Sequence, residues 1–166
     1  MHLYALVQWL QETSWATAIR ESLNLYPALY TLHICGFVIM VTATSVLDLR
    51  ILGYGLASRP VTSVSSLAIP WARAGLGANL ITGFLVFVAQ AVNMYTNTAF
   101  RVKMLMVLVA GINVGLVELT IKRNEANWSQ RGPAPAIAKF SALLSILLWF
   151  GIVAMSRVIG FTGAME

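Results

Sequence analysis

The chain carries little charge and a single cysteine. Only 10% of its 166 residues are charged and 58% are hydrophobic, whereas soluble domains carry about a quarter charged residues. Cys35 stands alone, which excludes an internal disulfide and any CxxC motif. The net charge of +5 is scattered without a basic run, so nothing favours nucleic acid as a partner. The composition predicts an integral membrane protein with a single domain over residues 1–166.

Motifs of soluble enzymes are also missing. The sequence contains no GxSxG, HExxH, Walker loop or dinucleotide fingerprint. Nothing in it argues for hydrolytic or group-transfer catalysis, so an enzymatic role is not indicated.

Four apolar runs are long enough to cross a bilayer, which takes about 20 helical residues. Before them, residues 3–20 carry apolar side chains at helical spacing together with Trp9 and Trp15, a pattern typical of a helix in the membrane interface. The sequence therefore predicts an all-α bundle of four transmembrane helices preceded by an interfacial helix. The predicted transmembrane helices span residues 26–47, 67–95, 100–121 and 136–159.

Basic residues are distributed unevenly between the connections. Because Lys and Arg favour the cytoplasmic side, the first and third connections are predicted to be cytoplasmic, with both termini in the periplasm of a bacterial inner membrane. The expected partners are the lipid bilayer and either other membrane-protein subunits or further copies of the chain. The basic residues assigned to the cytoplasmic side are Arg50, Arg59, Arg73, Lys122, Arg123, Arg131 and Lys139, against Arg20, Arg101, Lys103 and Arg157 on the other side.

Polar residues recur at a spacing of three to four in the second predicted helix, where Asn79, Thr82 and Gln90 lie on one stripe. In lipid, small and polar residues mark the faces where helices meet. We expect a structural role for this stripe and for Asn113 in the third helix. Asp48 and Arg73, near the ends of the first two helices, are expected to pair and tie those ends together.

His33 is an ionisable side chain inside the first predicted helix, which makes it a functional candidate by default. It shares a helix face with Tyr30, Phe37, Met40 and Thr44, so it should point into the bundle. One interpretation is a neutral imidazole bonded to Gln90 or Asn79, and the other is a metal or haem ligand. The candidate haem site comprises His33, Met40, Met106 and Gln90, and the candidate copper site comprises His33, Met104 and Met106.

A longer pattern resembles a family of uncharacterised bacterial four-helix inner-membrane proteins. It runs from about residue 15 to residue 113 and includes Leu25-Tyr26-Pro27, Leu32-His33, Gly36, Asp48-Leu49-Arg50, Leu52-Gly53, Pro70-Trp71, Thr82-Gly83, Phe100, Lys103 and Asn113. That family is distantly similar to copper resistance protein D and to b-type cytochrome bundles, which share an early Leu-His followed by Gly. The resemblance implies a bundle fold. Family members often carry a second histidine where Glu118 stands here.

Two functions follow from these observations. The first is a cofactor-binding membrane protein that holds haem b or copper through His33 for electron transfer or metal handling. Met or no protein group would be the sixth ligand of the haem. The second is a structural or accessory subunit of a larger membrane complex, in which the polar stripe only packs helices together.

Overall fold

The computed structural model describes residues 2–56, 58–123 and 134–162. All regular structure in these residues is helical, which confirms the predicted all-α fold class. Four helices are long and apolar enough to cross a membrane, so the chain is a multi-pass membrane protein. They are α3 (Leu25–Leu52), α4 (Val61–Ala89), α6 (Thr98–Arg123) and α8 (Ala136–Thr162).

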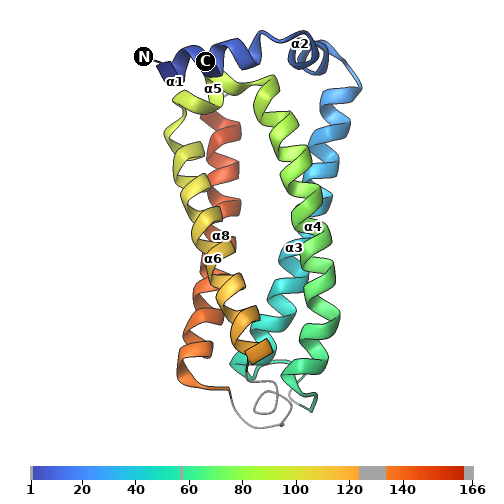
Figure 1. The fold of residues 1–166 in the computed structure, drawn as a ribbon, viewed down its shortest axis with the longest axis vertical. Coiled ribbons are helices and arrows are strands. Elements are labelled where there is room, and N and C mark those ends of the chain that lie inside the picture. Colours follow the sequence, from blue (N-terminus) through green and yellow to red (C-terminus); the bar gives the residue numbers. More distant parts are fainter. Residues whose placement is uncertain (1, 57, 124–133, 163–166) are drawn as a thin grey trace.

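Three short helices cover one end of the bundle, which we call the capped end (Figure 1). They are α1 (His2–Gln11), α2 (Ser14–Glu21) and α5 (Ala91–Thr96). Helix α1 packs on α5, and α2 packs on α3 and α4. Helix α8 also ends at the capped end, near the start of α1. The opposite end, where α3 ends and α4 begins, we call the loop end.

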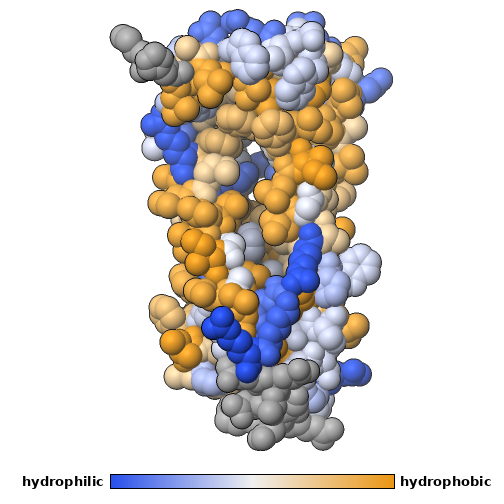
Figure 2. All heavy atoms as spheres, viewed as in Figure 1, coloured by the Kyte–Doolittle hydropathy of each residue, from blue (hydrophilic) through white to orange (hydrophobic). Residues whose placement is uncertain are grey.

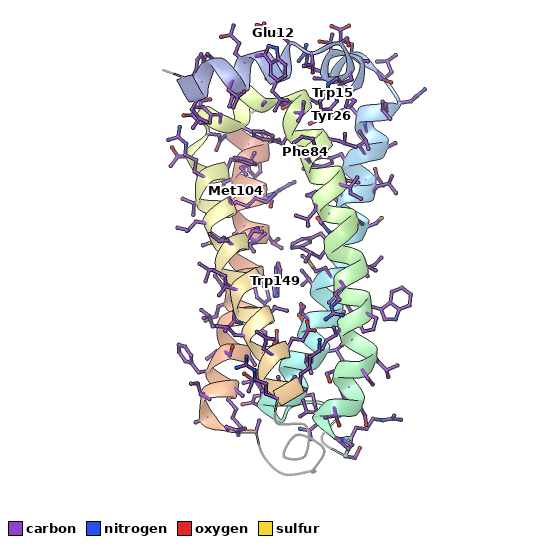
Figure 3. The ribbon with its side chains drawn as sticks, viewed as in Figure 1. Glu12, Trp15, Tyr26, Phe84, Met104 and Trp149 are labelled. Atoms are coloured by element: carbon purple, nitrogen blue, oxygen red, sulfur yellow. The ribbon has the colours of Figure 1, made fainter. Side chains whose placement is uncertain are left out.

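The interfacial segment is two helices rather than the single helix predicted over residues 3–20. Thr13 is extended, with φ −60° and ψ 146°, and its hydroxyl donates to the carbonyl of Leu10 at 2.8 Å. This bond supplies a partner to a carbonyl that the last turn of α1 leaves free. The break redirects the chain so that the ring of Trp15 reaches Phe84 on α4, 6.3 Å between centroids (Figure 3).

The long helices form two hairpins, α3 with α4 and α6 with α8 (Figure 1). Helix α3 also contacts α8, whereas α4 and α6 make only marginal contact although only the short helix α5 separates them in the chain. We call the space between them the α4–α6 groove. Stacked rings of Phe87 and Phe100, 5.7 Å apart, cross it near the capped end, and an ion pair between Arg73 and Glu118 crosses it near the loop end. Figure 2 shows the groove as an opening between the hairpins.

Helices α3 and α4 approach each other closely at two glycines. A Cβ on Gly75 would lie 2.7 Å from the carbonyl oxygen of Gly36 and 2.7 Å from the amide nitrogen of Met40. Both contacts are with backbone atoms, which cannot rotate away as a side chain can. Small residues let helices meet backbone to backbone, and dispersion contacts there hold them together without a hydrophobic driving force.

Helices α6 and α8 are joined by a polar contact and an apolar one. The amide of Asn113 donates to the carbonyl of Ser141 at 3.0 Å, and the hydroxyl of Ser141 donates back to Oδ1 of Asn113. Nearer the capped end, the sulfur of Met106 lies 3.1 Å from the point where a Cβ on Gly151 would be. The missing side chain of this glycine therefore makes room for the thioether.

The second transmembrane helix covers different residues from the predicted 67–95. It begins earlier, at Val61, and ends at Ala89, because Gln90 leaves the helical region with φ −134° and ψ 38°. Side chains from the short helices satisfy the backbone groups that the break frees. Arg20 donates to the carbonyl of Ala89 at 3.3 Å, and Oε1 of Gln11 accepts from the amide of Val92 at 2.8 Å. The break is thus compensated as a membrane protein requires.

The first transmembrane helix runs past its predicted end at residue 47. The prediction stopped before Asp48 and Arg50 because they are charged, but both are buried and remain helical. The helix ends instead at Gly53, which has φ +91° and whose amide donates to the carbonyls of Leu49 and Arg50. Glycine adopts this left-handed conformation without strain. Helices α6 and α8 extend two or three residues beyond the predicted spans.

Candidate ligand site at His33

His33 lies on α3 about two turns from the capped end, with its side chain half-buried against α4. Its Nδ1 is 3.0 Å from the hydroxyl oxygen of Thr82. A Cβ on the neighbouring Gly83 would lie 2.9 Å from Cε1 of the ring, so only a glycine leaves room for the imidazole in this position. The Thr82-Gly83 pair therefore fixes one edge of the ring.

The hydrogen bonds indicate which ring nitrogen carries the proton. A threonine hydroxyl has one hydrogen to donate, and Thr82 donates it to the carbonyl of Ala78 at 2.6 Å. Toward His33 the same oxygen can only accept, so Nδ1 is the donor. In the neutral ring, Nε2 then carries a lone pair. This is the form in which histidine binds a metal, with its other nitrogen hydrogen-bonded to hold the ring orientation.

Lys103 on α6 is half-buried and close enough to His33 for its charge to act on the imidazole. In the sequence, Lys103 stands among the basic residues that flank loops and in the family pattern, without an assigned role at His33. Its spacing could have identified it, because Lys103, Ala110 and Asn113 share the helix face that is turned into the bundle. The site thus combines an imidazole and an ammonium group from two different hairpins.

Gln90 lies nearer the capped end than His33. Its amide nitrogen donates to the hydroxyl of Tyr26 at 2.9 Å, and Tyr26 precedes His33 by about two turns of α3. The hydrogen bond that the sequence left open for His33 is made by Thr82, while the carbonyl of Asn79 lies beside the ring.

The candidate methionine ligands are spread over the bundle. Met40 is buried in an apolar cluster with Ala110 and Trp149, and Met106 packs against that cluster. Met104 is 47% exposed and lies on α6 nearer the capped end than Trp149 (Figure 3). In the part of the chain that the structure describes, no three His, Cys, Asp or Glu side chains converge on one point.

Three of the polar residues expected to be structural have partners within the bundle. Asn79 donates to the carbonyl of Gly75 at 3.1 Å, Thr82 bonds as described above, and Asn113 exchanges hydrogen bonds with Ser141. These bonds supply the partners that polar groups need in a medium without water.

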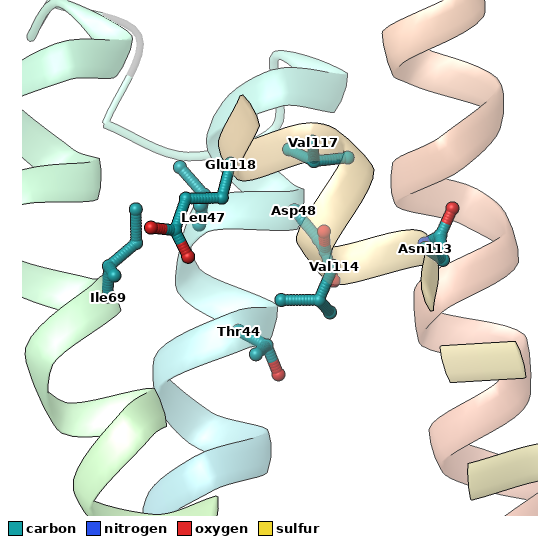
Figure 4. Close-up of a pocket in the computed structure, with 8 residues that line it drawn as sticks. All are labelled: Thr44, Leu47, Asp48, Ile69, Asn113, Val114, Val117 and Glu118. Atoms are coloured by element: carbon teal, nitrogen blue, oxygen red, sulfur yellow. The ribbon is translucent and has the colours of Figure 1, made fainter. Parts of the chain in front are cut away.

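Asp48 and Arg73 do not form the expected pair. Arg73 pairs instead with Glu118 of α6, which also pairs with Lys122 at 2.8 Å as its i,i+4 spacing indicates. The reason is the rotation of α4. Gly75 faces α3, and Arg73 lies two residues earlier, on a side of the helix turned toward the groove. Figure 4 shows the carboxylate of Glu118 turned toward α4, away from Asp48.

Comparison with known proteins gives a family but no activity. Residues 7–162 match the family described as "Family of unknown function (DUF6644)". The chain belongs to this family. No curated protein and no solved structure matches the chain. The further likeness to copper resistance protein D and to b-type cytochromes stays a prediction.

Proposed function

We propose that this protein binds haem b through Nε2 of His33, with copper as the alternative occupant. The observation that carries the proposal is the hydrogen bond from Nδ1 of His33 to Thr82, which leaves Nε2 with its lone pair. Such a bond at the other nitrogen is the usual support of a metal-binding histidine. When bound, a b-type haem supplies one-electron transfer.

The haem that we propose would be held by one protein ligand. His33 is the single histidine in the four long helices, and Met40 and Met106 are engaged in packing. His33 would therefore be the one residue of the long helices to hold the haem iron. Lys103, whose charge acts on His33, would supply a positive partner for a carboxylate of the bound group.

The orientation that we propose places the capped end in the periplasm. The start of α1 and the end of α8 both lie at that end, and the bias in Lys and Arg favours the cytoplasm for the loop end. Reporter fusions test this orientation. A fusion at Thr62 should report the cytoplasm and one at Thr96 the periplasm, and the reverse pattern would refute the assignment.

One observation favours the alternative of an accessory subunit. Asn79, Thr82 and Gln90 all have hydrogen-bond partners within the bundle, so helix packing alone accounts for the polar stripe. In that case the hydrogen bond between His33 and Thr82 joins α3 to α4, and His33 binds no cofactor.

An absorption spectrum and metal analysis of the purified protein distinguish the two functions. Protein from cells supplied with haem and copper should show a Soret band or stoichiometric copper, and His33→Ala should remove that signal. His2→Ala is the matched control and should retain it, because His2 lies in α1 outside the long helices. If the wild type shows neither signal, or if His33→Ala keeps it, the accessory role replaces the cofactor role.

A further inference from the structure

The α4–α6 groove is lined on α4 by apolar side chains that are open to the membrane. Phe87 marks the side of α4 that faces the groove, because its ring stacks on Phe100 of α6. Leu76 and Leu80 lie on the same side at helical spacing, and they are 42% and 63% exposed. In a bilayer, these side chains contact whatever occupies the groove.

The facing wall on α6 contains two glycines in a GxxxG pattern, Gly111 and Gly115. They share a helix face with Glu118, whose carboxylate crosses the groove to Arg73. A Cβ on either glycine would meet no atom within 4 Å. Such a pattern usually marks a close contact with another helix, and none of the helices that the structure describes makes one here.

Positive charge gathers at the loop end of the groove. Arg73 and Lys122 both pair with Glu118, so the three side chains together carry one net positive charge. The two basic side chains are 58% and 62% exposed, and each has further N–H donors beyond the one that Glu118 accepts. Figure 2 shows hydrophilic side chains at this end and hydrophobic ones on both sides above them. This end of the groove can therefore take an anionic group.

The basic residues and the glycines lie at the depths of a lipid headgroup and its acyl chains. From Phe100 to Lys122, α6 rises about 33 Å, close to the hydrocarbon thickness of about 30 Å. Lys122 therefore reaches the headgroup level at the loop end. Gly115 and Gly111 lie about 10 and 16 Å deeper along α6, and the acyl chains of one leaflet fill about 15 Å.

We propose that the groove binds one anionic phospholipid of the leaflet at the loop end. Its phosphate lies beside Arg73 and Lys122, and one of its acyl chains lies over Gly111 and Gly115. Basic pockets between transmembrane helices are typical sites for anionic headgroups. The exposed apolar wall of α4 covers the other side of the acyl chain.

A transmembrane helix of a partner fits the groove less well than an acyl chain. A helix with its side chains is about 10 Å across. Side chains join α4 to α6 at both ends of the groove, through the stacked phenylalanine rings and through the ion pair. A helix would have to displace these contacts, whereas a single acyl chain can lie between them.

Native mass spectrometry of the full chain tests the proposal. The delipidated protein is titrated in detergent with anionic phosphatidylglycerol and with zwitterionic phosphatidylcholine that has the same acyl chains. The wild type should retain one phosphatidylglycerol per chain and bind it at least about fivefold more tightly than phosphatidylcholine. Lys122→Gln should remove most of this preference. Lys139→Gln makes the same change near the start of α8, outside the groove, and should keep it.

A steric variant tests the path of the acyl chain without changing any charge. Gly111→Leu places a side chain in the groove, and because its Cβ meets no atom within 4 Å the protein should still fold. We expect this variant to lose the retained phosphatidylglycerol. Gly160→Leu is the matched control on α8, where an added Cβ also meets no atom within 4 Å, and it should bind like the wild type.

The proposal is overturned if the wild type binds the two lipids equally well. Wild-type retention of phosphatidylglycerol by either Lys122→Gln or Gly111→Leu would also overturn it. A dimer that Gly111→Leu converts to a monomer, with lipid retention unchanged, would assign the groove to a second copy of the chain instead.

Discussion

Gly75→Ala tests whether the close approach of α3 and α4 holds the bundle together. The added Cβ would lie 2.7 Å from two backbone atoms of α3, the oxygen of Gly36 and the nitrogen of Met40. Relief requires the helices to separate by roughly 0.7 Å, from 2.7 Å to the 3.4 Å at which ordinary contact begins. Overpacking of this kind costs about 1–3 kcal/mol, so we expect a loss of that size in the free energy of unfolding.

The matched control is Gly77→Ala on the same helix, since a Cβ at Gly77 meets no atom within 4 Å. Alanine is the better helix former in soluble hosts by about 1 kcal/mol, so this variant should be neutral or slightly stabilising. The assay is reversible unfolding in mixed micelles, followed by helical circular dichroism. Equal stability of Gly75→Ala and Gly77→Ala would refute this reasoning, because α3 and α4 could then separate without a loss of stability.

Three further predictions concern polar contacts. Thr82→Val removes the acceptor that orients the imidazole, and haem or copper affinity should fall about 10–100-fold; unchanged affinity in a ligand titration would contradict the assigned tautomer. Arg73→Glu should lower the stability of the protein, and the additional change Glu118→Arg should restore part of that stability. A double-mutant cycle should give a coupling free energy of about 0.5–3 kcal/mol. Additive effects would show that the ion pair contributes nothing to stability. Gln11→Ala removes the acceptor of the Val92 amide and should speed hydrogen exchange there, whereas unchanged exchange would exclude this cap.

The number of membrane-spanning helices and the all-α type of the fold could be predicted because they depend on local composition. An apolar run of sufficient length must satisfy its backbone internally, and a helix does so within one segment. The direction of the His33 side chain could also be predicted. Met40 and Thr44 lie on the same face of the helix at helical spacing, and both are buried. These features need no knowledge of which helices are neighbours.

Other features depend on contacts between residues far apart in the chain. The break at Gln90 interrupts a continuous apolar run, and the side chains that compensate it come from Gln11 and Arg20 in the short helices. The partner of Arg73 depends on how α4 is rotated relative to α3 and α6. Helical spacing places Lys103 on the inward face of α6, but its influence on His33 depends on how the two hairpins pack.

The proposed site at His33 should not respond to changes at Asp48, because an apolar layer lies between the two residues. Met40 is about two turns from each along α3, and it is buried in one cluster with Ala110 of α6 and Trp149 of α8. We therefore expect a folded Asp48→Asn variant to leave the spectrum of the proposed His33 site unchanged. Loss of that signal in a folded Asp48→Asn variant would show that the layer couples the two positions.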